Sequence, residues 1–189
     1  MKGSRAGLAA VLALAMTAAG LVAGCASSAD ATDQPEETDM PGFVLTSPSF
    51  SQGGAIPVDQ SCDGRDVSPA FHWEGAPVSA RSFALVVDDP DARGFIHWVA
   101  YDIAGGTSGD LPAGVGPSGP PSQGRNDFGR IGYGGPCPPS GTHHYRFTLY
   151  ALSAPLGLTG SPSAADVRAA ASRVLLGQTT LTATYTRRR

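Results

Sequence analysis

The stretch from residue 124 to residue 152 changes character halfway along, and this change constrains the fold most strongly. Its first part is rich in glycine and proline, whereas residues 145–152 are apolar, aromatic and β-branched. A rigid loop that leads into a buried strand has this composition. Two of the four histidines, His143 and His144, lie at the junction, where such a loop can hold polar groups in fixed positions.

Two further segments, residues 83–89 and 95–103, are predicted to be strands by their β-branched and aromatic content. Side chains alternate between the two faces of a strand, so each polar residue can be assigned to a face. On this basis Asp89, His97 and His143 each share a face with apolar residues, and Trp98 faces the opposite side from His97. The apolar residues expected on these faces are Phe83, Leu85 and Val87, then Phe95, Val99 and Tyr101, then Tyr145, Phe147 and Leu149.

The remaining segments indicate one mainly β domain over residues 43–189. Residues 104–142 hold many glycines and prolines and few aliphatic residues, so we expect long loops there. Ser163 and Asp166 have the spacing of a capping box, which predicts a helix that ends near Gly177. Residues 180–186 alternate threonine with apolar residues, which is typical of an edge or surface strand.

The N-terminus predicts export and a lipid anchor. Lys2 and Arg5 precede an uncharged segment, residues 6–24, which ends in Leu-Val-Ala-Gly before Cys25. This pattern is typical of a lipoprotein signal peptide, after whose removal Cys25 carries the acyl chains. We predict a signal peptide over residues 1–24 and a mature protein anchored to the bacterial cell membrane outside the cytoplasm. An ordinary signal peptide or an uncleaved helix is the alternative.

Residues 25–42 are predicted to be an acidic, disordered tether. After Cys25 this segment is rich in serine, alanine, threonine and proline, has five acidic residues, and lacks basic or large aliphatic side chains. Such a composition cannot bury a core. Residues 43–189 contain eleven arginines and eleven acidic residues, so the predicted domain is formally neutral. A neutral domain gives no electrostatic reason to expect nucleic acid as a partner.

Besides Cys25 the chain has two cysteines, Cys62 and Cys137. In an oxidising compartment such a pair tends to form a disulfide, which we predict here. Free thiols or metal-ligating thiols are the alternatives, although neither cysteine has a second one at ligand spacing.

The segment from Asp88 to Arg93 follows a predicted strand directly, and Pro90 removes a backbone donor there. Asp89 and Asp91 are candidates for an acid/base pair, a metal site or a turn, and the nearby His97 favours a functional role. A carboxylate beside a histidine orients the imidazole and favours its protonated form, which suits a small anion such as phosphate. The segment 132–135 would allow close backbone approach, and Pro136, Pro138 and Pro139 would form a wall of the pocket.

The order of short motifs resembles the phosphatidylethanolamine-binding protein family, in particular its bacterial Raf kinase inhibitor-like branch. The resemblance covers essentially all of residues 43–189. It implies a central antiparallel sheet with Greek-key connections, a smaller second sheet, one or more short peripheral helices, and a small anion-binding cavity at one end. The matching motifs are Cys62-Asp-Gly, Ser68-Pro, Trp73, Asp89-Pro-Asp-Ala, His97-Trp, Gly134-Gly-Pro-Cys-Pro-Pro and His143-His-Tyr.

The resemblance also implies functional residues. It assigns the ligand pocket to Asp89, His97, His143 and Tyr145, gives Asp91 a supporting role in the loop, and places Pro138 and Pro139 near the rim. Two positions depart from the family pattern: Arg93 replaces a common proline, and His144 replaces a common arginine. Arg93 is expected to point into solvent, with a cation at the pocket mouth as the alternative, and His72 is expected to be a structural histidine.

These observations predict a lipid-anchored binding protein whose pocket holds phosphate, another small anion or a phospholipid headgroup, without a cofactor. A protein-interaction role, as a kinase regulator or protease inhibitor, is the first alternative. A hydrolase that uses Asp89, His97 and His143 as metal ligands or acid/base groups is the second. The sequence has no short-spaced metal signature and no esterase-type nucleophile, so we expect a binding protein rather than an enzyme.

Overall fold

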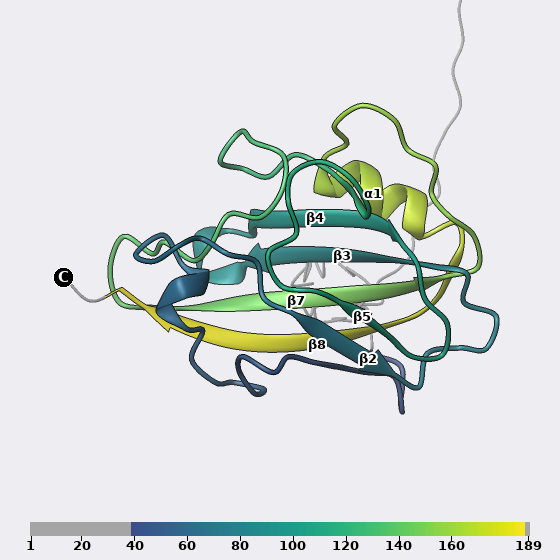
Figure 1. The fold of residues 1–189 in the computed structure, drawn as a ribbon, viewed down its shortest axis with the longest axis horizontal. Helices are drawn as coiled ribbons and strands as arrows, with labels where there is room; N and C mark the ends of the chain where they lie inside the picture. Colours follow the sequence, from purple (N-terminus) through teal and green to yellow (C-terminus); the bar gives the residue numbers. More distant parts are fainter. Residues whose placement is uncertain (1–38, 188–189) are drawn as a thin grey trace, which may run out of the picture. The chain divides into compact units, whose positions relative to one another are not determined.

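The computed structural model describes residues 39–187, which form two antiparallel sheets (Figure 1). The larger sheet has the strand order β6-β4-β3-β7-β8, and the smaller one has the order β1-β2-β5. The mainly β fold class with a second, smaller sheet is therefore confirmed. The elements are β1 (Val44–Thr46), η1 (Val58–Gln60), β2 (Phe71–Glu74), β3 (Ser82–Asp89), η2 (Pro90–Ala92), β4 (Phe95–Ile103), β5 (Gly109–Leu111), β6 (Ser122–Gln123), β7 (Thr142–Leu152), α1 (Ala164–Ala171) and β8 (Leu175–Thr186).

Strand β3 lies at the centre of the larger sheet and is buried along its whole length. One of its faces packs into the core that contains residues of the smaller sheet, and the other packs into the core that contains α1. A strand buried on both faces needs a continuous apolar run, which explains the sequence Phe-Ala-Leu-Val-Val. The first face carries Phe83, Leu85 and Val87, and the second carries Ala84 and Val86.

Helix α1 covers the second face of the larger sheet, beside β4 (Figure 1). Its capping box is present: the Ser163 hydroxyl accepts a hydrogen bond from the Asp166 N–H, and the Asp166 carboxylate accepts one from the Ser163 N–H. The buried residues Ala164, Val167 and Ala171 are spaced at helical intervals and form the packing face. The predicted start of the helix is confirmed, whereas its end comes earlier than Gly177.

A β-bulge in β4 overturns part of the predicted face assignment. Val87 pairs with Trp98, but Asp88 pairs with Ile96, so His97 is an extra residue between them. An extra residue reverses the alternation of side chains beyond it. Trp98 therefore packs in the same core as Val87, on the same side as His97, and our prediction that the two residues face opposite sides is wrong. For the same reason Val99 and Tyr101 belong to the α1 side rather than to the face of His97.

Strand β8 is an edge strand, as predicted, but it begins at Leu175 rather than Thr180. Backbone groups of residues 53–56 hydrogen-bond to Thr182 and Thr184 along its outer edge. The Asp39 carboxylate accepts hydrogen bonds from Thr180, and the Met40 N–H donates to the Gln178 carbonyl. The described end of the predicted tether, residues 39–42, thus contacts the domain, and the strand edge is covered against pairing with other chains. The predicted signal peptide, Cys25 and tether residues 26–38 lie outside the described residues.

Candidate ligand site at the end of the central strands

Asp89 ends β3 and connects three elements. Because Pro90 cannot donate to the sheet, the chain turns there into η2, whose first residues Asp89 caps. One carboxylate oxygen of Asp89 accepts a hydrogen bond from the Ala92 N–H at 3.1 Å, and the other accepts one from His143 Nδ1 at 2.7 Å. The Asp89 side chain is only 4% exposed and that of His143 is 15% exposed. His143 is therefore held in one orientation, and its Nε2 remains for another partner.

His97 is fixed by the loop that precedes β7. Its Nδ1 lies 2.7 Å from the Gly134 carbonyl oxygen, so Nδ1 carries a proton and donates it there. Burial lowers the pKa of His97 below its ordinary value of 6.5, although the Gly134 carbonyl and the Asp89 carboxylate partly oppose this shift. The ring is therefore neutral near pH 7. For His97, burial outweighs the carboxylate effect that favoured a protonated imidazole in the sequence analysis.

Tyr145 brings an unpaired hydroxyl to the same place. Its ring centre lies 5.1 Å from that of His97, in an edge-on arrangement. The hydroxyl is fully buried and makes no hydrogen bond of ordinary geometry among the described residues, although it lies close enough to the Asp89 carboxylate for a weak interaction. Burial and the nearby Asp89 carboxylate raise the pKa of Tyr145, so the group stays protonated and can donate. Buried polar groups without partners are uncommon in folded proteins, and the Tyr145 hydroxyl is one of a few such side-chain groups in residues 39–187.

Two aromatic residues complete this cluster, namely Phe95, which strand alternation predicted on the face of His97, and Phe128, which no sequence pattern predicted. The His97 ring centre lies 5.3 Å from those of both Phe95 and Phe128, and the two phenyl centres are 4.9 Å apart. The Arg130 guanidinium stacks over the Phe128 ring, 5.4 Å from its centre. Phe128 is 43% exposed, which is unusual for a phenylalanine in contact with buried residues. Phe128 lies in a loop far from His97 in the sequence, so no local pattern connects it with the site.

The other residues predicted around the site lie at its edge. Asp91 accepts hydrogen bonds from the backbone N–H and Nδ1 of His144 at 2.7 and 2.8 Å, and these bonds join η2 to β7. They also lower the pKa of Asp91. His144 and Arg93 are exposed, Pro138 is buried and Pro139 is exposed. His72 lies away from this cluster, in β2, where it pairs with Asp110 of β5 at 2.8 Å.

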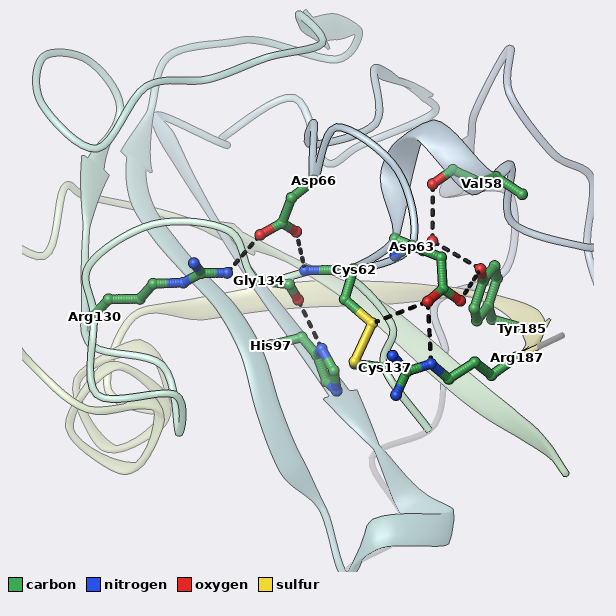
Figure 2. Close-up of a disulfide and its surroundings, with 12 residues drawn as sticks. Val58, Cys62, Asp63, Asp66, His97, Arg130, Gly134, Cys137, Tyr185 and Arg187 are labelled. Carbon is green, nitrogen blue, oxygen red and sulfur yellow. Dashed lines mark hydrogen bonds and ion pairs between the residues drawn. A yellow bond between two sulfur atoms is a disulfide. The ribbon is translucent and has the colours of Figure 1, made fainter. Parts of the chain in front are cut away.

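A disulfide between Cys62 and Cys137 joins two loops beside His97 (Figure 2). The same loops are connected by the Cys62 N–H, which donates to the Pro136 carbonyl at 3.1 Å. The Gly135 N–H donates to the Asp66 carboxylate at 2.6 Å. These contacts surround the peptide whose carbonyl binds His97, so the predicted disulfide is present and supports the position of the imidazole.

Within residues 39–187, no three histidine, cysteine, aspartate or glutamate side chains are grouped so that they could hold a metal ion. The cavities among residues 39–187 include one of about 420 Å³ and one of about 450 Å³. The first lies among the loops that contain Asp66, Val115 and Arg130, and the second lies against the smaller sheet, next to Phe71. Neither is lined by Asp89, His97 or His143.

Fold and site together define a two-sheet β domain with a cluster of buried polar groups at one end of its central strands. Residues 46–186 match the family model described as phosphatidylethanolamine-binding protein. A UPF0098 protein from Methanothermobacter thermautotrophicus is 43% identical over 149 residues, which span 76% of this chain and 98% of that protein. LppC from Mycobacterium tuberculosis, whose name marks it as a candidate lipoprotein, is 45% identical over 168 residues, which span 85% of this chain and 79% of that one.

Solved structures agree with these matches. CT736 from Chlamydia trachomatis, described as a homologue of phosphatidylethanolamine-binding proteins, superposes with a TM-score of 0.72 at 33% identity and covers 79% of this chain and 100% of its own. YbcL from Escherichia coli, described as a new member of the mammalian family, has a TM-score of 0.71 at 32% identity and covers 78% and 99% of the two chains. The chain therefore belongs to the phosphatidylethanolamine-binding protein family. Residues 39–187 contain no helix long and apolar enough to span a membrane.

Replacing both bridged cysteines, as Cys62→Ser with Cys137→Ser, should lower the free energy of unfolding by about 2–4 kcal/mol, because the bridge closes a long loop in the unfolded chain. Urea denaturation of the variant and of the unreduced parent measures this difference. Treating the parent with a dithiol reductant should produce the same loss, and the variant should not respond to the reductant. Equal stability of parent and variant, or two free thiols in an unreduced sample, would contradict the bridge.

Proposed function

We propose that this domain binds a small anion, namely phosphate or the phosphate of a phospholipid headgroup, at Asp89, His97, His143 and Tyr145. The observation that carries the proposal is the buried, unpaired hydroxyl of Tyr145, which lies beside two histidines that each use only Nδ1 within the protein. The lipidated Cys25 would hold the domain at the outer face of the cell membrane, where headgroups are available. The name of the mycobacterial relative supports such an anchor.

The unused groups favour an anion over a cation. The Tyr145 hydroxyl is a donor, and the Nε2 atoms of His97 and His143 become donors when they are protonated. Phosphate oxygens accept several such hydrogen bonds at once, and charged hydrogen bonds are the stronger kind. A phosphate that still carries a proton can also donate it to the neutral Nε2 of His97. The site therefore suits a ligand with acceptor oxygens and an acidic proton.

The carboxylate of Asp89 does not exclude an anion from the site. Each of its oxygens already accepts a hydrogen bond, and the side chain is almost completely buried. Its negative charge nevertheless favours a ligand that also carries a positive group. The faces of Phe95 and Phe128 can receive an ammonium group by a cation–π contact. We therefore expect phosphorylethanolamine, which carries both charges, to bind more tightly than inorganic phosphate.

Ligand entry requires a movement at the rim, because the Tyr145 hydroxyl is closed to solvent. Phe128 is the rim residue best suited to move: it is half-exposed, it belongs to a loop, and its ring contacts His97. A shift of this ring would open the space next to the imidazole. The strands that carry Asp89 and Tyr145 would stay in place, because their neighbouring side chains are buried.

The variant Tyr145→Phe should change ligand affinity without lowering the free energy of unfolding. Removing an unpaired buried hydroxyl should leave the free energy of unfolding unchanged or raise it by up to about 1 kcal/mol, whereas the affinity for phosphorylethanolamine should fall roughly tenfold. Calorimetric titration and urea denaturation measure the two quantities in the full chain carrying Cys25→Ser, which prevents lipidation. Tyr133→Phe is the matched control: it removes a buried hydroxyl that donates to the Gln60 carbonyl at 2.7 Å, so it should reduce stability and leave binding intact. Unchanged binding by Tyr145→Phe would contradict the proposed site.

Sulfate affinity should rise as the pH falls from about 8 to 5. Sulfate carries no acidic proton in this range, so it requires donors, and His97 donates through Nε2 only after it takes up a proton. Since the pKa of His97 is lowered in the free protein, the proton must be taken up on binding, and raising the pH opposes this uptake. Titrations at several pH values measure how strongly the sulfate affinity depends on pH, and His97→Gln should reduce this dependence. A flat affinity across the range would count against this role of His97.

A further inference from the structure

A preformed cavity of about 420 Å³ lies outside the proposed anion site. Three loop segments line it, namely residues 65–68, 114–117 and 130–133. Its volume is in the range of small-molecule sites. The segment 130–133 ends next to Gly134, whose carbonyl binds His97, so neighbouring residues of one loop contribute to the cavity and to the anion site.

Buried polar side chains hold each wall of this cavity in position. The Ser68 hydroxyl accepts a hydrogen bond from the Val115 N–H at 2.9 Å. The Gln123 amide contacts the carbonyl of Gly116, between the lining residues 115 and 117, and the Asn126 amide donates to the Gly132 carbonyl at 2.9 Å. Ser68, Gln123 and Asn126 are 2%, 7% and 2% exposed. Walls fixed by buried hydrogen bonds do not collapse readily, so the cavity is a stable feature of the fold.

At the cavity, some arginine N–H donors have no hydrogen-bond partner among the described residues, whereas the carboxylate oxygens of Asp66 already accept hydrogen bonds. Arg65 donates to Asp59 through Nε and one terminal nitrogen, and Arg130 donates to Asp66 through one terminal nitrogen at 2.6 Å. A guanidinium has five N–H donors, so both arginines keep free donors. The Asp66 oxygens, in contrast, already accept from Arg130 and from the Gly135 N–H. The Arg65–Asp59 pair is largely exposed, and in the second pair the Arg130 side chain is 53% exposed while that of Asp66 is 28% exposed. Ion pairs with exposed guanidinium groups are weak enough for a ligand to share.

The rest of the lining is largely apolar. Ile131 is 40% exposed, so part of this apolar surface is in contact with water in the free protein. We propose that the cavity is a second ligand site, which takes a small organic carboxylate with an aliphatic or aromatic body. The carboxylate would bind the guanidinium groups of Arg130 and Arg65, and the body would cover the apolar lining. The apolar and aromatic lining residues are Val67, Val115, Pro117, Ile131 and Tyr133.

Titration with hexanoate tests this site in the full chain carrying Cys25→Ser. We expect saturable shifts of the amide resonances of Gly114 and Gly132, which line the cavity. Acetate lacks the apolar body and 1-hexanol lacks the charge, so both should bind much more weakly. Arg130→Gln should weaken hexanoate binding roughly tenfold, because a charged hydrogen-bond partner is lost. Arg81→Gln is the matched control, since Arg81 is also exposed but lies outside the cavity.

One further measurement separates this site from the proposed anion site. His143→Ala should leave hexanoate binding intact, even if the proposed function fails, because His143 does not line the cavity. If Arg130→Gln does not fold, Arg65→Gln provides the same test, because Arg65 pairs only with the exposed Asp59 among the described residues. The proposal is overturned if no saturable shifts occur, if acetate or 1-hexanol shifts the same resonances equally, or if folded arginine variants bind hexanoate as the parent does.

Discussion

The buried carboxylate of Asp89 is the interaction on which the candidate site depends. A buried charge is costly unless it is hydrogen-bonded, so Asp89 requires both of its partners. One partner is the backbone of η2, and the other is the imidazole of His143 on β7. The same carboxylate therefore ends the central strand, caps the turn that follows and orients the imidazole of His143.

Near this carboxylate, the side chains of His97 and Tyr145 are fixed in position but carry no charge near pH 7. Burial keeps His97 neutral, and the Tyr145 hydroxyl stays protonated. A ligand that brings its own negative charge and proton completes these hydrogen bonds, which is why the proposed binding is coupled to protonation. The disulfide between Cys62 and Cys137 stabilises the loops on which the orientation of His97 depends. The hydrogen bond between His97 and the Gly134 carbonyl thus connects the candidate site to the loops that the disulfide stabilises.

Local sequence patterns predicted β3, β4 and β7 but not the short strands β1, β2, β5 and β6. Strands β3 and β7 alternate without an irregularity where they pair from Ser82 to Asp88. The faces of Asp89 and Tyr145 followed from this alternation. The face of Trp98 did not, because the bulge at His97 arises from the register between β3 and β4, which a single segment does not reveal. Phe128 was also missed, since its contact with His97 depends on how a long loop folds back. Family motifs supplied the candidate pocket residues, whereas neither motif nor pattern indicated that burial lowers the pKa of His97.

A crystal structure of the chain with phosphorylethanolamine would show directly whether the anion binds at Asp89, His97, His143 and Tyr145. We expect the phosphate to lie within hydrogen-bond distance of Tyr145 Oη and of Nε2 of His97 and His143, with the Phe128 ring displaced. A ligand bound elsewhere, with the Tyr145 hydroxyl still unpaired and closed to solvent, would contradict this expectation.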